Sequence, residues 1–179
     1  MSQYYFKDKR VDRLAQKRGY TPGDIFYSPI SLWLSYYLLI LFTASTTVGL
    51  FFIDYWVECA IFLLGAYLAA AYLNNSFIVT FDQLIVVNTN FPFRRTKVYN
   101  ISEIEDIHIS KEGLVPGLLF AFFIGSGNYV QVNTLHKSKR FYCICLDIDC
   151  YDENNTEKTL DDLHFKLRVK GIRVHFELD

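Results

Sequence analysis

The sequence predicts a membrane α-helical hairpin followed by an α+β domain. An almost unbroken apolar block runs from Ile30 to Leu73, interrupted only by Asp54 and Glu58. After this block the apolar residues alternate with a period of two, which is typical of strands, and near the C-terminus they return to helical spacing. The chain therefore divides into a basic cytoplasmic segment (1–29), a two-helix transmembrane hairpin (30–73) and a cytoplasmic β-rich domain (74–179).

The charges around the apolar block predict its orientation. Residues 1–29 are rich in Lys and Arg and lack the short apolar core of a cleavable signal peptide. Basic residues beside a span favour the cytoplasmic side, and the turn at Asp54 and Glu58 has none. We therefore expect a multi-pass protein of the cytoplasmic (inner) membrane with both termini in the cytoplasm.

The two spans are expected at Ser31–Ile53 and Tyr55–Leu73, because each reaches the roughly 20 apolar residues that cross a bilayer. The alternative, two buried helices of a soluble core, would require polar stripes at helical spacing. No charge lies in the middle of either span, which argues against transport or ion conduction. Small residues allow close helix packing. The expected packing residues are Gly49, Gly65, Ala66, Ala69 and Ala70.

An antiparallel β meander is expected after the hairpin, with turns at Asp82-Gln83 and Asn90–Phe93. Residues 101–107 match a one-sided helical turn that passes into a strand. The segment His136–Arg140 is expected to be a basic turn. Strands are expected over residues 76–81, 84–89, 94–100, 107–110, 118–124, 129–134 and 141–148.

A helix is expected at Thr156–Lys170, followed by a final strand at Ile172–Leu178. Gly171 suits the C-terminal cap of this helix, because glycine adopts the left-handed conformation without a steric penalty. The apolar stripe of the helix consists of Leu160, Leu163 and Leu167.

The residues between Asn75 and Ser110 follow a recognisable layout: strand, Asp-Gln turn, strand, aromatic and arginine turn, strand, and an I-x-x-I-x-x-I stretch. The residues that carry it are Phe77, Val79, Leu84, Val86, Arg94, Arg95, Val98, Ile101, Ile104 and Ile107. This layout resembles the membrane-flanked bacterial pleckstrin-homology-like (PH-like) domains, in which a two-helix hairpin precedes the strands. The resemblance implies a PH-like antiparallel β domain, from which this chain departs by its strand after the helix.

No constellation in the sequence predicts catalysis. A metal site could be drawn from Cys143, Cys145, Cys150 and His136, but C-x-C on a strand is unlike a zinc knuckle, and small buried hydrophobic residues explain these cysteines better. The residues His108, His164 and His175 are scattered along the chain. We therefore expect no enzyme, no cofactor and no metal. The net charge of −1 also argues against a nucleic-acid partner.

Two basic turns are the candidate binding surface, since turns of a β scaffold often carry binding residues. Their residues are Arg94, Arg95, Lys97, Lys137, Lys139 and Arg140. They can contact an acidic partner or anionic lipid headgroups, and ordinary solvated turns are the alternative.

The expected function is a non-enzymatic, membrane-anchored scaffold or assembly subunit. Its PH-like domain would dock a protein partner within a membrane complex, or a second copy of the chain, with membrane lipids around the hairpin. The alternatives are a small membrane-surface enzyme or regulatory subunit, and a lipid-headgroup sensor.

Overall fold

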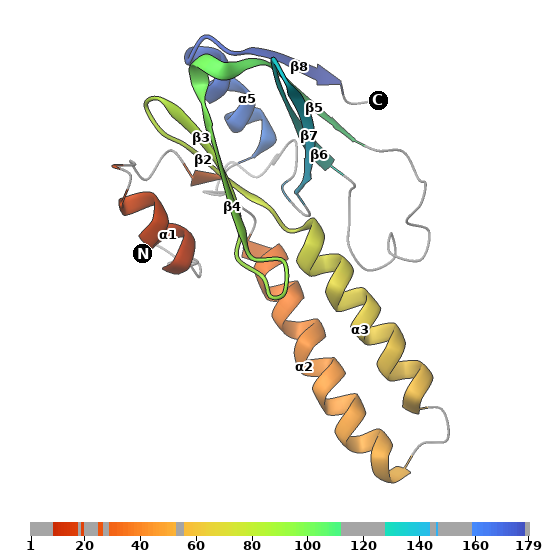
Figure 1. The fold of residues 1–179 in the computed structure, drawn as a ribbon. Coiled ribbons are helices and arrows are strands. Elements are labelled where there is room, and N and C mark those ends of the chain that lie inside the picture. The colour runs from red at the N-terminus through yellow and green to blue at the C-terminus, as the bar shows by residue number, and fades with distance from the viewer. Residues whose placement is uncertain are drawn as a thin grey trace, which may run out of the picture.

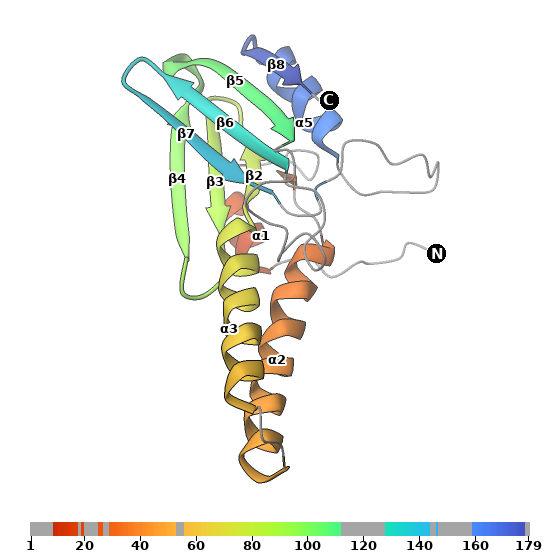
Figure 2. The ribbon, with the colours of Figure 1, turned by 90° about the vertical axis from the view of Figure 1, so that its right-hand side faces the viewer.

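A β-sheet body carries two long helices that project from it side by side (Figure 1, Figure 2). The computed structural model of the chain describes residues 9–17, 19, 25–26, 29–52, 56–111, 128–143, 146 and 159–177. The projecting helices are α2 (Pro29–Phe52) and α3 (Trp56–Leu73). Figure 2 shows that α3 leads directly into the body.

The first sheet is antiparallel and has the strand order β1-β2-β3-β4. Both of its faces are covered, which explains why β2 and almost all of β3 are buried. On β3, Leu84 and Val86 face the main core, whereas Ile85 and Val87 pack in a cluster with Val11 of α1. The elements are α1 (Lys9–Gln16), β1 (Ile25–Phe26), β2 (Ser76–Val79), β3 (Gln83–Asn88) and β4 (Arg95–Asn100).

The second sheet has the order β7-β6-β5-β8, with β8 parallel to β5 and the other pairs antiparallel. Its inner face contributes Ile107, Val130 and Phe141 to the main core, and the side chains of the opposite face are mostly polar. The elements are the 3₁₀ turn η2 (Ile101–Glu103), β5 (Ile104–Lys111), β6 (Asn128–Thr134), β7 (Lys137–Tyr142) and β8 (Arg173–Glu177).

Helix α5 (Leu160–Val169) packs its apolar stripe into the core, and Leu160, Leu163 and Leu167 are fully buried as predicted. The helix begins at a capping box, in which the Thr159 hydroxyl accepts a hydrogen bond from the Asp162 backbone N–H. It ends at Gly171, whose φ of 81° is the left-handed conformation that the sequence predicts there. The predicted start at residue 156 is too early, because Thr159 is extended and is the N-cap of the helix.

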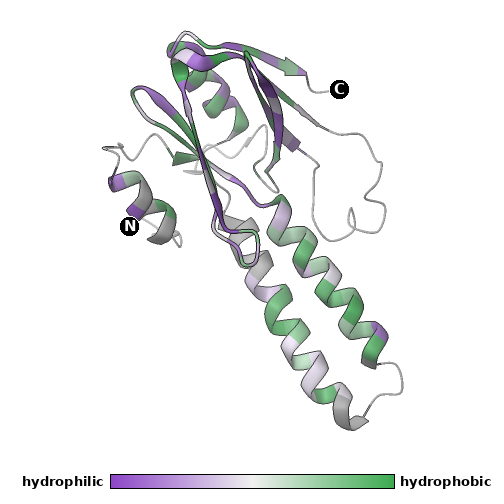
Figure 3. Cartoon of the chain, viewed as in Figure 1, coloured by the Kyte–Doolittle hydropathy of each residue, from purple (hydrophilic) through white to green (hydrophobic). Residues whose placement is uncertain are grey.

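The prediction of two membrane-spanning helices is contradicted. Among the described residues, no helix combines the length and the apolar content that crossing a membrane requires. Helix α3 has 18 residues, or about 27 Å, and carries Glu58 in its first turn. In α2, Thr43 and Thr47 add hydroxyl groups, which bond to backbone carbonyls one turn earlier. Figure 3 shows pale segments among the apolar ones on this helix.

This correction extends to the statements that depended on the spans. The fold class loses its transmembrane hairpin, and the predicted multi-pass location in the inner membrane is likewise contradicted for the described chain. The sequence count failed because it treated both runs as uniformly apolar and gave their hydroxyl-bearing and acidic positions too little weight.

Two smaller predictions also change. Residues 101–107 were expected to be helical, but only η2 is, and β5 begins at Ile104. A register shift between Ile104 and Asp106 places an extra residue in β5, so Ile104 and Ile107 both reach the core at a helix-like spacing of three. Most of the expected turn at 136–140 belongs to β7 instead. The predicted strand at 118–124 lies outside the described residues.

Candidate functional site

Three of the six predicted basic residues meet where the two sheets adjoin. Strands β4 and β7 are edge strands of different sheets, and their side chains alternate between two faces. This alternation places Arg95, Lys97 and Tyr99 on one face of β4, and Lys139 and Phe141 on one face of β7. We call Arg95, Lys97 and Lys139 the cationic cluster.

Aromatic rings hold the cationic cluster in place. The Arg95 guanidinium carbon lies 5.1 Å from the Tyr72 ring centroid and 5.9 Å from that of Phe141. The Lys139 ammonium lies 5.7 Å from the same Phe141 ring, which is fully buried and meets Tyr99 edge to face. These are favourable cation–π arrangements, so the rings tether the charged groups at the edge of the core.

Hydrogen bonding restrains Arg95 further. Its Nη2 donates to the Asn75 side-chain oxygen at 3.2 Å, while its buried Nε has no hydrogen-bond partner among the described residues. A guanidinium has five donors in a fixed plane, so this side chain is only partly satisfied.

The two lysines of the cluster approach each other closely. A hydrogen bond with Lys97 lowers the pKa of Lys139 from 10.5 to about 8, and partial burial and the charges of Lys97 and Arg95 act in the same direction. No carboxylate of the described residues forms an ion pair with either lysine. Within the described part of the chain, the cluster therefore concentrates positive charge without a paired carboxylate.

The other three predicted basic residues lie apart from this cluster. Arg94 is exposed just before β4, and Lys137 is exposed at the start of β7. Arg140 lies on the opposite face of β7, where its Nε donates to Gln131 Oε1 at 2.8 Å and its guanidinium carbon lies 4.9 Å from the Tyr129 ring centroid. The structure thus separates the predicted basic residues, and it places Lys139 and Arg140 on opposite faces of the second sheet.

The predicted packing residues lie along the α2–α3 pair. Ala66 and Ala70 are buried beside Leu38, and Ala69 packs at the margin of that cluster. Gly49 is also buried, whereas a methyl group added at Gly65 would meet open space. The pair is joined to the body by hydrogen bonds from Asn88 Nδ2 to the Ala71 carbonyl, at 2.8 Å, and from the Tyr67 hydroxyl to the Phe91 carbonyl, at 2.6 Å.

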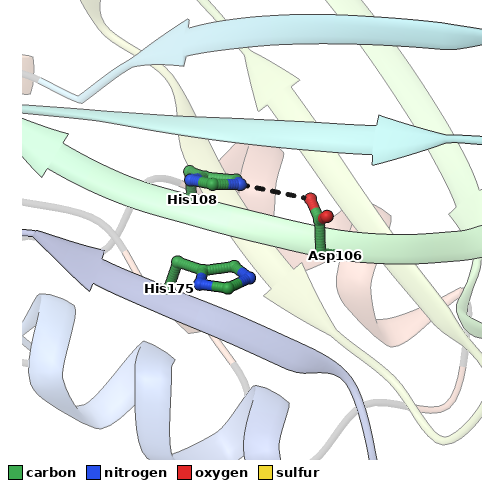
Figure 4. A group of neighbouring side chains, drawn as sticks. All are labelled: Asp106, His108 and His175. Carbon is green, nitrogen blue, oxygen red and sulfur yellow. Dashed lines mark ion pairs between the residues drawn. The ribbon is translucent and has the colours of Figure 1, made fainter.

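The structure also brings together two of the histidines that are scattered along the sequence. On the outer face of the second sheet, the rings of His108 and His175 stack with centroids 4.5 Å apart and planes 19° apart. The Nε2 atom of His108 lies 3.5 Å from Oδ1 of Asp106 (Figure 4). We call Asp106, His108 and His175 the histidine cluster. His164 belongs elsewhere, because it stacks on Phe176.

Parallel pairing of β5 with β8 brings the two histidines together, since His108 and His175 are register partners. The one local signal was the spacing of Asp106 and His108, which puts both on the same face of a strand. The third member comes from the far end of the chain. The metal site drawn from the cysteines is not tested, because Cys145 and Cys150 lie outside the described residues. Burial raises the pKa of the Cys143 thiol.

Comparisons with protein-family models, with curated proteins and with solved structures found no match to this chain. The resemblance to PH-like domains stays a prediction from the sequence.

Proposed function

We propose that this chain is a non-enzymatic docking protein whose β domain binds an acidic, extended segment of a protein partner at the cationic cluster. The observation that carries the proposal is the convergence of Arg95 and Lys139 on the Phe141 ring, where these two cations form no ion pair with a carboxylate of the described residues. A bound carboxylate would offset their repulsion and accept their hydrogen bonds.

The surroundings of the cluster support a polypeptide as the ligand. β4 ends one sheet and β7 ends the other, although the outer edge of β7 is already paired at its end, where the Tyr142 carbonyl accepts hydrogen bonds from the backbone N–H and Nδ2 of Asn75. Such edges accept an added strand through backbone hydrogen bonds, while neighbouring side chains provide specificity. An extended acidic segment could therefore use both features at once, with its backbone along an edge and its carboxylates at Arg95 and the two lysines.

Arg95 would supply directional recognition in this arrangement. Its guanidinium is tethered over Tyr72 and Phe141, so little side-chain freedom remains to be lost on binding. The planar donors of arginine suit a carboxylate better than the single ammonium of lysine does. The expected division of roles is that Arg95 orients the acidic group and the lysine pair adds charge.

A fluorescently labelled glutamate oligomer is a suitable probe, with binding followed by fluorescence anisotropy at low and moderate salt. Lys97→Ala and Lys139→Ala should each weaken binding about three- to tenfold, the range expected for loss of a partly screened, charge-assisted contact. Arg168→Ala removes the same charge from the exposed end of α5 and should leave binding nearly unchanged.

Arg140→Ala provides a second control, because Arg140 neighbours Lys139 in sequence but lies on the other face of β7. Equal losses from Arg140→Ala and Lys139→Ala would show a diffuse charge effect and refute the proposed site. Binding of inorganic phosphate or anionic vesicles at this cluster, with no binding of the glutamate oligomer, would favour the headgroup alternative over a protein partner.

A further inference from the structure

The outer face of the second sheet presents a group of metal-binding side chains that is separate from the cationic cluster. We propose that Asp106, His108 and His175 form a surface site for a divalent transition-metal ion of the zinc type. The potential ligand atoms of these three residues all lie within 4.8 Å of one another. In Figure 4 the ring edges of both histidines point toward the side on which Asp106 lies.

The geometry requires only small side-chain movements. In a tetrahedral site with bonds of about 2.0–2.1 Å, neighbouring ligand atoms are about 3.4 Å apart. His108 Nε2 and Asp106 Oδ1 are already 3.5 Å apart, so the remaining adjustment falls mainly on His175. That residue is exposed on the edge strand β8, where its ring can turn without displacing core atoms.

A hydrogen-bond chain restrains the carboxylate through the same oxygen that lies near His108. Asn133 Nδ2 donates to Asp106 Oδ1, and the Asn133 side-chain oxygen accepts from Gln131 Nε2 at 3.1 Å. Gln131 in turn accepts from Arg140 Nε at 2.8 Å. Partners of this kind orient metal-binding carboxylates in known sites, and their loss commonly weakens metal binding. Arg140, absent from the cationic cluster, thus has a place in this second network.

The donor set selects the class of ion. Two imidazoles and one carboxylate suit Zn²⁺, Ni²⁺ or Cu²⁺, whereas Mg²⁺ and Ca²⁺ prefer a shell made of oxygen atoms. Three protein ligands leave a fourth position of a tetrahedral zinc ion open to water. The neighbouring charges are balanced, since Arg173 and Glu177 flank His175 at alternate positions of β8 and carry opposite signs.

The proposal is tested on the full chain after chelator treatment and dialysis. Isothermal titration with zinc chloride should give one ion per chain, and cobalt chloride should produce the visible absorption of a four-coordinate Co²⁺ ion. His108→Ala and His175→Ala should each weaken zinc binding at least tenfold and remove the cobalt spectrum. Asn133→Ala, which touches no metal, should weaken binding by about tenfold through the carboxylate.

His164→Ala is the matched control, because His164 lies on α5, where it stacks on Phe176 and is not part of the histidine cluster. Its zinc affinity should equal that of the unaltered chain. Circular dichroism of each metal-free variant verifies that the fold is retained, which the position of all three ligands outside the core favours. Absence of zinc binding at 100-fold molar excess would overturn the proposal, as would zinc affinity that is unchanged in His108→Ala and His175→Ala.

Discussion

The cationic cluster lies where the two sheets adjoin, and the histidine cluster lies on the outer face of the second sheet. On the inner side, Lys139 faces Lys97 and Arg95 across the seam between two sheets, over the buried ring of Phe141. On the outer side, His108 and His175 stack beside a carboxylate held by an amide chain. Among the described residues no carboxylate forms an ion pair with the lysines of the first group, while the second group already contains a carboxylate.

The difference shows how one strand alternation can produce two opposite binding preferences. An added anion would stabilise the cationic cluster, because its positive groups repel one another over apolar rings. An added cation would stabilise the histidine cluster, because imidazole nitrogen and carboxylate oxygen atoms are electron-pair donors. Four experiments separate the two groups.

The largest expected effect concerns the Phe141 ring beneath the cationic cluster. Phe141→Ala should lower the free energy of unfolding by about 3–5 kcal/mol, because the side chain is fully buried between the sheets. Tyr129→Ala, which removes the half-buried ring beneath Arg140 on the outer face, should cost only about 1 kcal/mol. Urea unfolding followed by circular dichroism measures both. Equal losses would show that the two faces do not differ in burial as described.

Metal ions should stabilise the folded chain through the histidine cluster and not through the cationic cluster. Zinc at about 100 times its dissociation constant should stabilise the folded chain by about 2.7 kcal/mol, which raises the midpoint of thermal unfolding by about 5–10 °C. Removal of zinc with a chelator should reverse the shift, and His175→Ala should abolish it. Lys97→Met should keep the full shift. A shift that persists in His175→Ala would place the ion elsewhere.

The third prediction concerns the charge of Lys139. Replacing Lys97 by methionine removes the hydrogen bond and the like charge that hold the pKa of Lys139 near 8, so this pKa should rise toward 10.5. NMR titration of the lysine side chains measures the change directly. Arg140→Met should leave the pKa of Lys139 within a few tenths, because Arg140 lies on the other face. A pKa near 10.5 in the unaltered chain would refute the close approach.

The smallest effect is on stability as a function of pH. Because the pKa of Lys139 is lower in the folded chain than in the unfolded one, the unfolded chain binds more protons between pH 8 and 10.5. Stability therefore rises with pH in this window through Lys139. Relative to Lys139→Met, the unaltered chain should gain at most about 1 kcal/mol, since solvent screens the partly exposed group. Chemical denaturation at several pH values compares the two, and parallel curves would contradict the prediction.

Much of the local structure could be predicted from the sequence. The limits of β2, β3, β4 and β6 match the alternating runs to within two residues, and the helix pair was found with small errors at its ends. The membrane interpretation is contradicted, because no helix of the described residues has the length and apolar content that crossing a membrane requires. The pairing of β8 with β5 and the packing of α1 on the first sheet could not be predicted from any local sequence pattern.

Of the candidate sites, the sequence identified the residue types of the cationic cluster but treated six basic residues as one surface. Only the fold separates Lys139 from Arg140, because the expected turn that contains them is largely a strand and sends neighbouring side chains to opposite faces. The histidine cluster was not predicted at all.

By itself the sequence determined the presence of α5 and its C-terminal end, because its leucine stripe and Gly171 act within a few residues of one another. It also determined which stretches alternate as strands. Only the tertiary structure decided that His175 lies beside His108 and that Lys97 meets Lys139. Those contacts depend on which strands pair or face each other, and in which register. That choice follows from burying the core as a whole, because the local pattern of each strand is compatible with several partners.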